Sequence, residues 1–167
     1  MLVARYTLRA HRAAYLLGAG EESDDVVQEA FVKAFQHLSR FRTGEPFGPW
    51  LLRIVTNETR NLVRSRRRRA GLALRLGTAE PAGTAADAPA DEVLAAERRT
   101  RLVAAVNTLP ARERQVLVCR YFLELSEAET AQVLACPLGS VKSRTSRALN
   151  RLRGLLVPAP ESRVPSG

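Results

Sequence analysis

Residues 126–153 read SEAETAQVLACPLGSVKSRTSRALNRLR, and this stretch decides the fold of the C-terminal half. Ser126 and Glu129 have the spacing of a capping box, in which each side chain accepts a hydrogen bond from the other residue's backbone amide. Residues 136–139, with a proline and a glycine, interrupt the helical pattern, and Ser140 is expected to cap a second helix. The stretch therefore predicts a helix-turn-helix.

The second helix of this unit is basic, because residues 140–153 contain five Lys or Arg side chains and no acid. A recognition helix enters the major groove of DNA by its N-terminal residues, so side chains near that end or off the apolar stripe are the expected contacts. These side chains are Ser140, Lys142, Ser143, Ser146 and Arg147. A basic helix that faces only solvent is the alternative.

Helical periodicity continues through the N-terminal half. Apolar residues recur at three- and four-residue steps, which predicts helices that each bury one face. The first such stripe contains Val27, Ala30, Phe31, Ala34, Phe35 and Leu38. A second stripe runs from Phe47 to Leu62, and an earlier helix is expected through Tyr6 to Leu17. No segment alternates like a strand, so the predicted fold is all-α.

Residues 71–91 read GLALRLGTAEPAGTAADAPAD, a composition rich in Ala, Gly and Pro that cannot bury enough surface to offset its ordering entropy. The sequence therefore predicts two small helical domains joined by a flexible linker. The expected limits are residues 1–70, a linker over 71–94, a second domain over 95–156 and a disordered tail over 157–167. Domains of this size have little surplus stability, so we expect them to move independently until a partner fixes their spacing.

The net charge of +9 is concentrated in two places. Residues 50–69 hold seven basic side chains and one acid, residues 96–167 hold twelve and six, and residues 70–95 are acidic. Clustered positive charge indicates a polyanionic partner such as nucleic acid. On the polar side of the helix that starts near Phe47, the candidate contacts are Arg53, Asn57, Arg60, Asn61 and Arg64, followed by the run Arg66 to Arg69.

The residue types of metal and catalytic sites are sparse. The two histidines and two cysteines, His11, His37, Cys119 and Cys136, have no metal-ligand or nucleophile-base spacing, and no glycine-rich phosphate loop is present. We therefore predict no catalytic residue, no metal and no cofactor, and expect both cysteines to be small buried hydrophobic residues. No apolar stretch approaches the ~18 residues of a membrane span, so no membrane insertion and a cytoplasmic location are expected.

Six short motifs carry a resemblance to a known family. They are DVVQEAF at residues 25–31, FR at 41–42, FGPWL at 47–51, IVTN at 54–57, LPARER at 109–114 and GSVKSR at 139–144. The first four resemble region 2 of extracytoplasmic-function sigma factors, and the last two resemble region 4 of the same family. Together they span nearly the whole chain in the family's order, with a linker where the family has one.

The resemblance implies a specificity subunit that binds core RNA polymerase and promoter DNA and has no catalytic site of its own. It implies polymerase contacts at Asp25, Gln28, Glu29 and Phe31. It implies minus-10 contacts at Arg42, Arg53, Asn57, Arg60, Asn61 and Arg64, with an unstacked base captured by the loop over residues 39–47. It implies minus-35 contacts at Ser140, Lys142, Ser143, Arg144, Ser146 and Arg147, and an anti-sigma factor as a further partner.

Other classes of protein remain open at this point. A stand-alone DNA-binding regulator would use the helix-turn-helix alone, and a nonspecific RNA-binding protein would explain the arginine runs but not two ordered motif sets. An enzyme has little support. Within the folded halves, Phe47 and Trp50 are expected in the core because they lie on the apolar stripe. The hydroxyls of Thr130 and Thr145 are expected to weaken the small C-terminal core.

Overall fold

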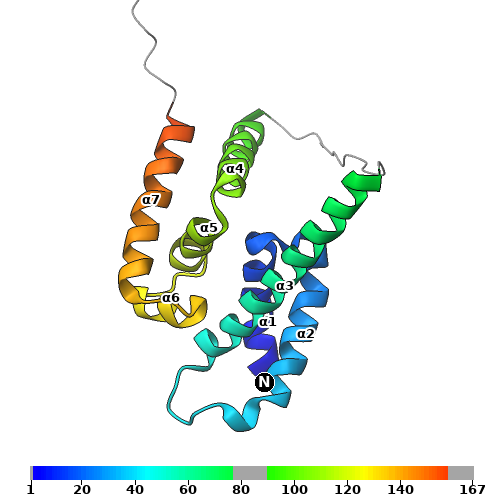
Figure 1. The fold of residues 1–167 in the computed structure, drawn as a ribbon. Helices are drawn as coiled ribbons and strands as arrows, with labels where there is room; N and C mark the ends of the chain where they lie inside the picture. Colours follow the sequence, from blue (N-terminus) through cyan, green and yellow to red (C-terminus); the bar gives the residue numbers. More distant parts are fainter. Residues whose placement is uncertain (1, 77–89, 158–167) are drawn as a thin grey trace, which may run out of the picture.

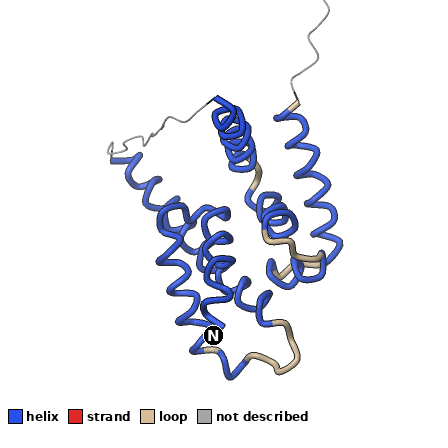
Figure 2. Tube along the Cα trace, turned by 180° about the vertical axis from the view of Figure 1, so that it is seen from behind, coloured by secondary structure: helices blue, strands red, loops and turns tan. Residues whose placement is uncertain are grey.

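The structure, a computed structural model, describes residues 2–76 and 90–157, and all of its regular elements are helices (Figures 1 and 2). The N-terminal group consists of α1 (Leu2–Ala14), α2 (Ser23–Gln36) and α3 (Phe47–Leu76), with the short turns η1 (Tyr15–Ala19), η2 (Gly20–Glu22) and η3 (Leu38–Arg40). The C-terminal group consists of α4 (Ala90–Thr108), α5 (Ala111–Leu117), η4 (Val118–Phe122), α6 (Glu127–Leu134) and α7 (Leu138–Leu156). The all-α prediction is confirmed.

Helix α3 is longer than the sequence suggested. It continues through Leu76, six residues beyond the expected end at residue 70, because residues 71–76 include Leu, Ala and Arg, which favour helix. Helix α4 begins at Ala90, inside the expected linker. Of the predicted linker, residues 71–76 and 90–94 are therefore helical, and residues 77–89 lie outside the described residues, as does the tail from residue 158.

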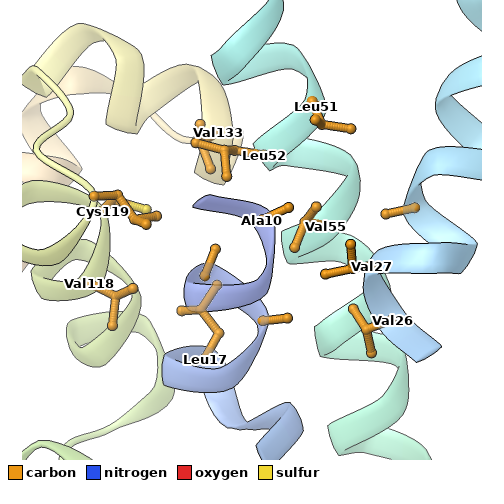
Figure 3. Packing of buried hydrophobic residues seen from close by; sticks show 14 of the residues in the cluster. Ala10, Leu17, Val26, Val27, Leu51, Leu52, Val55, Val118, Cys119 and Val133 are labelled. Atoms are coloured by element: carbon orange, nitrogen blue, oxygen red, sulfur yellow. The ribbon is translucent and has the colours of Figure 1, made fainter. Parts of the chain in front are cut away.

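The N-terminal group packs around small and β-branched side chains (Figure 3). Ala10, Ala13 and Ala14 of α1 are fully buried, which lets α1 lie close to its neighbours. Leu51 and Val55 of α3 are also fully buried in the same cluster. Each such aliphatic side chain contributes roughly 1.5–3 kcal/mol on burial, so this core holds α3 in place along the other two helices.

Four half-buried aromatic rings close the end of this group. Phe41 lies 5.1 Å from Trp50 and 5.7 Å from Phe47, and Phe47 lies 5.3 Å from Tyr6 and 5.4 Å from Trp50, between ring centroids. Tilted and edge-on pairs at these distances stabilise a fold by about 0.5–1.5 kcal/mol each. Phe47 and Trp50 therefore pack in the core, as predicted, and Phe41 anchors the start of the loop that leads into α3.

The turn between α1 and α2 depends on a glycine and an arginine. Gly18 has φ of 114°, a conformation that favours glycine. The Arg66 guanidinium donates hydrogen bonds to the carbonyl oxygens of Gly18, at 2.8 Å, and Ala19, at 2.5 Å, and forms an ion pair with Glu22 at 3.3 Å. One member of the arginine run thus satisfies backbone carbonyls of this turn, a role that its sequence did not indicate.

The two groups share a buried core, which contradicts the expectation of independent domains. Helix α6 packs against α3, and Val118 and Cys119 of η4 face α1 (Figure 3). Cys119 is fully buried and belongs to the same apolar cluster as Leu17 and Leu52. Between described residues, two hydrogen bonds cross the junction: Arg9 Nη2 donates to the Leu123 carbonyl at 2.6 Å, and Arg60 Nη2 donates to Gln115 Oε1 at 2.9 Å. Burial across the junction adds stability that neither small group has alone.

A shared core predicts a single unfolding transition. Trp50, the only tryptophan, lies in the N-terminal group, so its fluorescence reports that group, whereas far-ultraviolet circular dichroism reports all helices. We expect the two signals to change at the same urea concentration, because coincident transitions indicate cooperative unfolding. A circular dichroism transition with a second step that Trp50 fluorescence does not follow would contradict the shared core.

Candidate nucleic-acid and protein interfaces

The helix-turn-helix forms as the sequence predicts, except at one boundary. The backbone amide of Glu129 donates to Ser126 Oγ at 3.1 Å and that of Ser126 donates to Glu129 Oε2 at 2.7 Å, which completes the capping box. Ala135, with φ of 50°, ends α6 in the left-handed conformation. Helix α7 then begins at Leu138 after Pro137, so the prediction that Ser140 caps it is wrong. The extended backbone of Pro137 starts the helix, and Ser140 lies in its first turn.

Most of the predicted DNA contacts on α7 point to solvent. Lys142, Ser143, Ser146 and Arg147 are exposed, whereas Ser140 and Arg144 are half-buried. Within the helix, Arg147 Nε donates to the Ser143 carbonyl at 3.4 Å and Ser143 Oγ donates to the Ser140 carbonyl at 3.3 Å, both weak contacts at the surface. The four exposed side chains can therefore turn toward base edges or phosphates without breaking a strong internal bond.

A buried carboxylate anchors α7 to α5. Glu113 is 5% exposed, and its Oε2 lies 2.9 Å from Arg151 Nε of α7. Apolar contacts of Leu117 with Ala148 and Leu149 support the same pair of helices. Removing one partner of such a pair leaves a buried charge without its counterion, which lowers the free energy of unfolding. Glu113 was not among the residues that the sequence indicated; it lies three and four residues before the buried Val116 and Leu117, on the same face of α5.

Thr130 is the weak point of the C-terminal core. Its side chain is fully buried, and its Oγ1 has no hydrogen-bond partner among the described residues, whereas the Thr145 hydroxyl donates to the Val141 carbonyl at 2.8 Å. Substitution Thr130→Val keeps the shape and removes the unsatisfied hydroxyl. We expect it to raise the free energy of unfolding by about 1 kcal/mol, measured by urea denaturation. Thr145→Val, which loses a satisfied bond, is the control and should not stabilise.

The predicted contacts on the N-terminal group divide into exposed and occupied residues. Arg42 lies in the loop before α3, and it is exposed, as are Arg53, Asn57, Asn61 and Arg64 on α3. Arg60 is half-buried at the junction, where it donates to Gln115. Burial lowers the pKa of the Arg60 guanidinium, and the nearby charges of Arg144 and Arg112 lower it further. Arg60 is thus not free for a DNA contact while the two groups are packed together.

The outer face of α2 carries the predicted protein contacts. Asp25, Gln28 and Glu29 are exposed, and Phe31 is half-buried against the core. Lys33 Nζ lies 2.7 Å from Glu58 Oε2 of α3 and 3.4 Å from Glu29 Oε1. The hydrogen bond that Lys33 donates to Glu58 is the largest factor that raises the pKa of Lys33. These contacts fix the orientation of α2 on α3.

One aromatic side chain on α2 and one aliphatic side chain on η3 are exposed, although the sequence placed both in the buried stripe. Phe35 is 80% exposed and Leu38 is 49% exposed, so this part of the prediction is wrong. Phe35 lies in the last turn of α2, which ends at Gln36, and its exposure shows that no described element covers it. Exposed apolar residues that lie together and are surrounded by polar ones are typical of a protein-binding surface, and Phe35 and Leu38 lie three residues apart. Phe35 and Leu38 therefore extend the candidate protein interface beyond the residues that the sequence indicated.

None of the helices in the two described ranges is both long and apolar enough to cross a membrane.

Comparison with protein families identifies both helical groups. Residues 2–69 match the family model Sigma-70 region 2, and residues 99–152 match Sigma-70, region 4. The region 2 match covers the N-terminal helical group, and the region 4 match covers most of the C-terminal group.

Individual proteins give the same result. The chain is 37% identical to RNA polymerase sigma factor CnrH of Cupriavidus metallidurans over 161 residues, which cover 93% of this chain and 84% of that protein. The fold of this chain matches the sigma factor RpoE in complex with the anti-sigma factor NepR from Bartonella quintana. The TM-score is 0.69 and the identity is 25%, and the match covers 92% of this chain and 93% of the RpoE chain. It also matches CnrH in complex with the cytosolic domain of CnrY, with a TM-score of 0.68, 32% identity and coverage of 93% and 84%.

Proposed function

Because this chain belongs to the extracytoplasmic-function group of the sigma-70 family, we propose that three sets of its residues make the contacts by which it directs RNA polymerase to promoters. The chain is a sigma factor, which binds core RNA polymerase and directs initiation at promoters through minus-10 and minus-35 recognition. The observation that carries this conclusion is the presence of both regions, in family order, in one chain. Sigma factors are non-catalytic specificity subunits, so we assign no reaction to this chain, which acts in the cytoplasm with the polymerase.

The polymerase contacts in this proposal are on α2. Asp25, Gln28 and Glu29 supply polar groups, and Phe31 supports them from the core. The exposed Phe35 adds an apolar anchor, because aromatic side chains contribute strongly at protein interfaces. Region 2 in this assignment covers residues 1–70, and region 4 covers residues 95–156.

The DNA contacts in this proposal lie on α3 and α7. Arg42, Arg53, Asn57, Arg60, Asn61 and Arg64 form the minus-10 set, and Ser140, Lys142, Ser143, Arg144, Ser146 and Arg147 form the minus-35 set. The minus-10 and minus-35 elements of a promoter are centred about 25 base pairs apart, which is ~85 Å of duplex at 3.4 Å per base pair. Arg60 and Arg144, however, line one cavity in the structure. The packed arrangement therefore cannot contact both elements of one promoter at once, and the two groups must separate when the polymerase and promoter are bound.

An anti-sigma factor belongs to the same proposal. The sigma factor RpoE that this chain matches over 92% of its length is in complex with the anti-sigma factor NepR. That match extends over both helical groups. We assign a partner of this kind to the packed arrangement, in which the two DNA-binding sets are not available together.

The test of the polymerase set is binding to sigma-free bacterial core polymerase, at a salt concentration that suppresses nonspecific binding by arginines. The wild-type chain should co-elute with the enzyme in size exclusion. Gln28→Ala should weaken this binding at least tenfold, whereas Gln132→Ala, on the exposed face of α6, should not. Equal binding by both variants would remove α2 from the interface.

The test of the minus-35 set uses two arginines of α7. Arg147 is the middle residue of the helix, and Arg153 lies in its last turn. Arg147→Ala should reduce promoter-specific transcription by roughly 5- to 150-fold, the effect of losing one good base contact. Arg153→Ala should have little effect. Specific promoter binding by the chain alone, with no binding to core polymerase, would instead support a stand-alone regulator.

A further inference from the structure

A cavity of about 530 Å³ lies at the junction between the two helical groups. Six arginines from both groups line it: Arg60, Arg64 and Arg67 of α3, Arg112 and Arg114 of α5, and Arg144 of α7. No Asp or Glu is among its described lining residues. Its volume is within the range of small-molecule sites. The junction thus brings together a concentration of positive charge that neither group has alone.

None of the six lining arginines forms an ion pair with a residue in the described part of the chain. Burial lowers the pKa of Arg114, and the charge of Arg67 from the other group lowers it further. Arg114 nevertheless stays charged near neutral pH, because the guanidinium of arginine remains protonated in proteins. Like charges that face each other across the junction raise the free energy of the packed arrangement. An anion in the cavity would remove this repulsion.

Several guanidinium donors in the cavity are also unused. Arg114 Nε is buried and has no hydrogen-bond partner in the described part of the chain. Arg64, Arg67, Arg112 and Arg144 form no hydrogen bond or ion pair with any residue that the structure places. Guanidinium forks match the oxygens of phosphate groups in bidentate geometry. The cavity therefore offers both the charge and the donors that phosphate groups require.

We propose that this cavity binds the phosphate chain of a small polyphosphate and that the bound anion bridges the two helical groups. Several phosphates in a row supply enough negative charge and oxygen acceptors to pair with arginines on both sides. Leu17, Val63, Leu134 and Pro137 form an apolar part of the lining, which accommodates an organic group attached to the phosphates.

The consequence for transcription rests on the proposed function. Arg60, Arg64 and Arg144 belong to the proposed promoter contacts and also line the cavity. A polyphosphate that occupies the cavity therefore competes with promoter phosphates and favours the packed arrangement. The level of such an anion would set the fraction of the sigma factor that can be used.

The direct test is isothermal titration calorimetry of the full chain with inorganic tripolyphosphate, without magnesium, polymerase or DNA. Arg67→Gln and Arg112→Gln each remove one exposed lining arginine, one from each helical group, and neither belongs to the proposed promoter contacts. We expect one site per chain, with Kd raised at least tenfold in either variant. Arg68→Gln and Arg98→Gln, also exposed and outside the cavity lining, are the matched controls and should change Kd less than twofold.

A second titration with GTP distinguishes the sources of the phosphate chain. Equal Kd values for GTP and tripolyphosphate would show that the site binds the phosphates alone. Tighter binding of GTP would show that the apolar part of the lining contacts the nucleoside. Both outcomes support the proposal. No binding, or equal losses in all four variants, would overturn it. So would a short thymidine oligonucleotide that binds more tightly than tripolyphosphate and depends on Arg67, because the cavity would then hold a nucleic-acid strand. None of these Kd measurements depends on polymerase binding or transcription.

Discussion

Substitution Arg66→Ala is expected to lower the free energy of unfolding by roughly 2–4 kcal/mol, although Arg66 lies in a run of four arginines that resembles a solvated DNA-binding tail. The guanidinium donates to the Gly18 and Ala19 carbonyls and pairs with Glu22. Hydrogen bonds from a charged group contribute ~1.5–3 kcal/mol each, and removing the donor leaves both carbonyls without it. The midpoint of thermal unfolding should fall by roughly 5–15 °C for a cooperative unit of this size.

The neighbouring arginine supplies the control. Arg68 is exposed and forms no hydrogen bond or ion pair with a described residue, so Arg68→Ala should change the free energy of unfolding by less than ~0.5 kcal/mol. Arg and Ala have similar helix propensities, so the comparison isolates the contacts of Arg66. Arg66→Lys keeps the charge but not the planar fork and should recover little stability. Urea denaturation followed by Trp50 fluorescence measures all three, and equal losses in Arg66→Ala and Arg68→Ala would contradict this role.

The thiol of Cys119 is expected to react with iodoacetamide at pH 8 about 10³-fold more slowly than an ordinary cysteine. Burial raises the pKa of Cys119 from 9.0 to about 12, because the thiolate is disfavoured away from water. The thiolate is the reactive form, and three pKa units reduce its fraction about 10³-fold. Since the group titrates near pH 12, the rate should rise about tenfold for each pH unit between 8 and 11.

Two single-cysteine variants make this measurement specific. Cys136→Ser leaves only Cys119, and Cys119→Ser leaves only Cys136, which is half-buried at the cavity. In guanidinium chloride the two variants should react at the same rate, because unfolding removes the burial. Rapid alkylation of Cys119 in the folded chain at pH 8 would show that η4 does not stay packed against α1 and α3.

Local patterns predicted the elements whose signals lie within a few residues. The capping box of Ser126 and Glu129 formed as expected. Ser140 was misplaced because serine at an expected cap is only a preference, and the extended backbone of Pro137 starts α7 instead. Phe35 was misplaced because periodicity shows which face is apolar, not whether another element covers it.

The sequence by itself determined the helices, their order and the family, because periodicity, capping and motif spacing are properties of neighbouring residues. It also determined which side chains are candidates for polymerase and promoter contacts. Only the tertiary structure decided that Arg66 holds a turn, that Arg60 faces Gln115 and that six arginines surround one cavity. These facts depend on contacts between residues about 50 or more positions apart, and such contacts are set by how apolar faces pack.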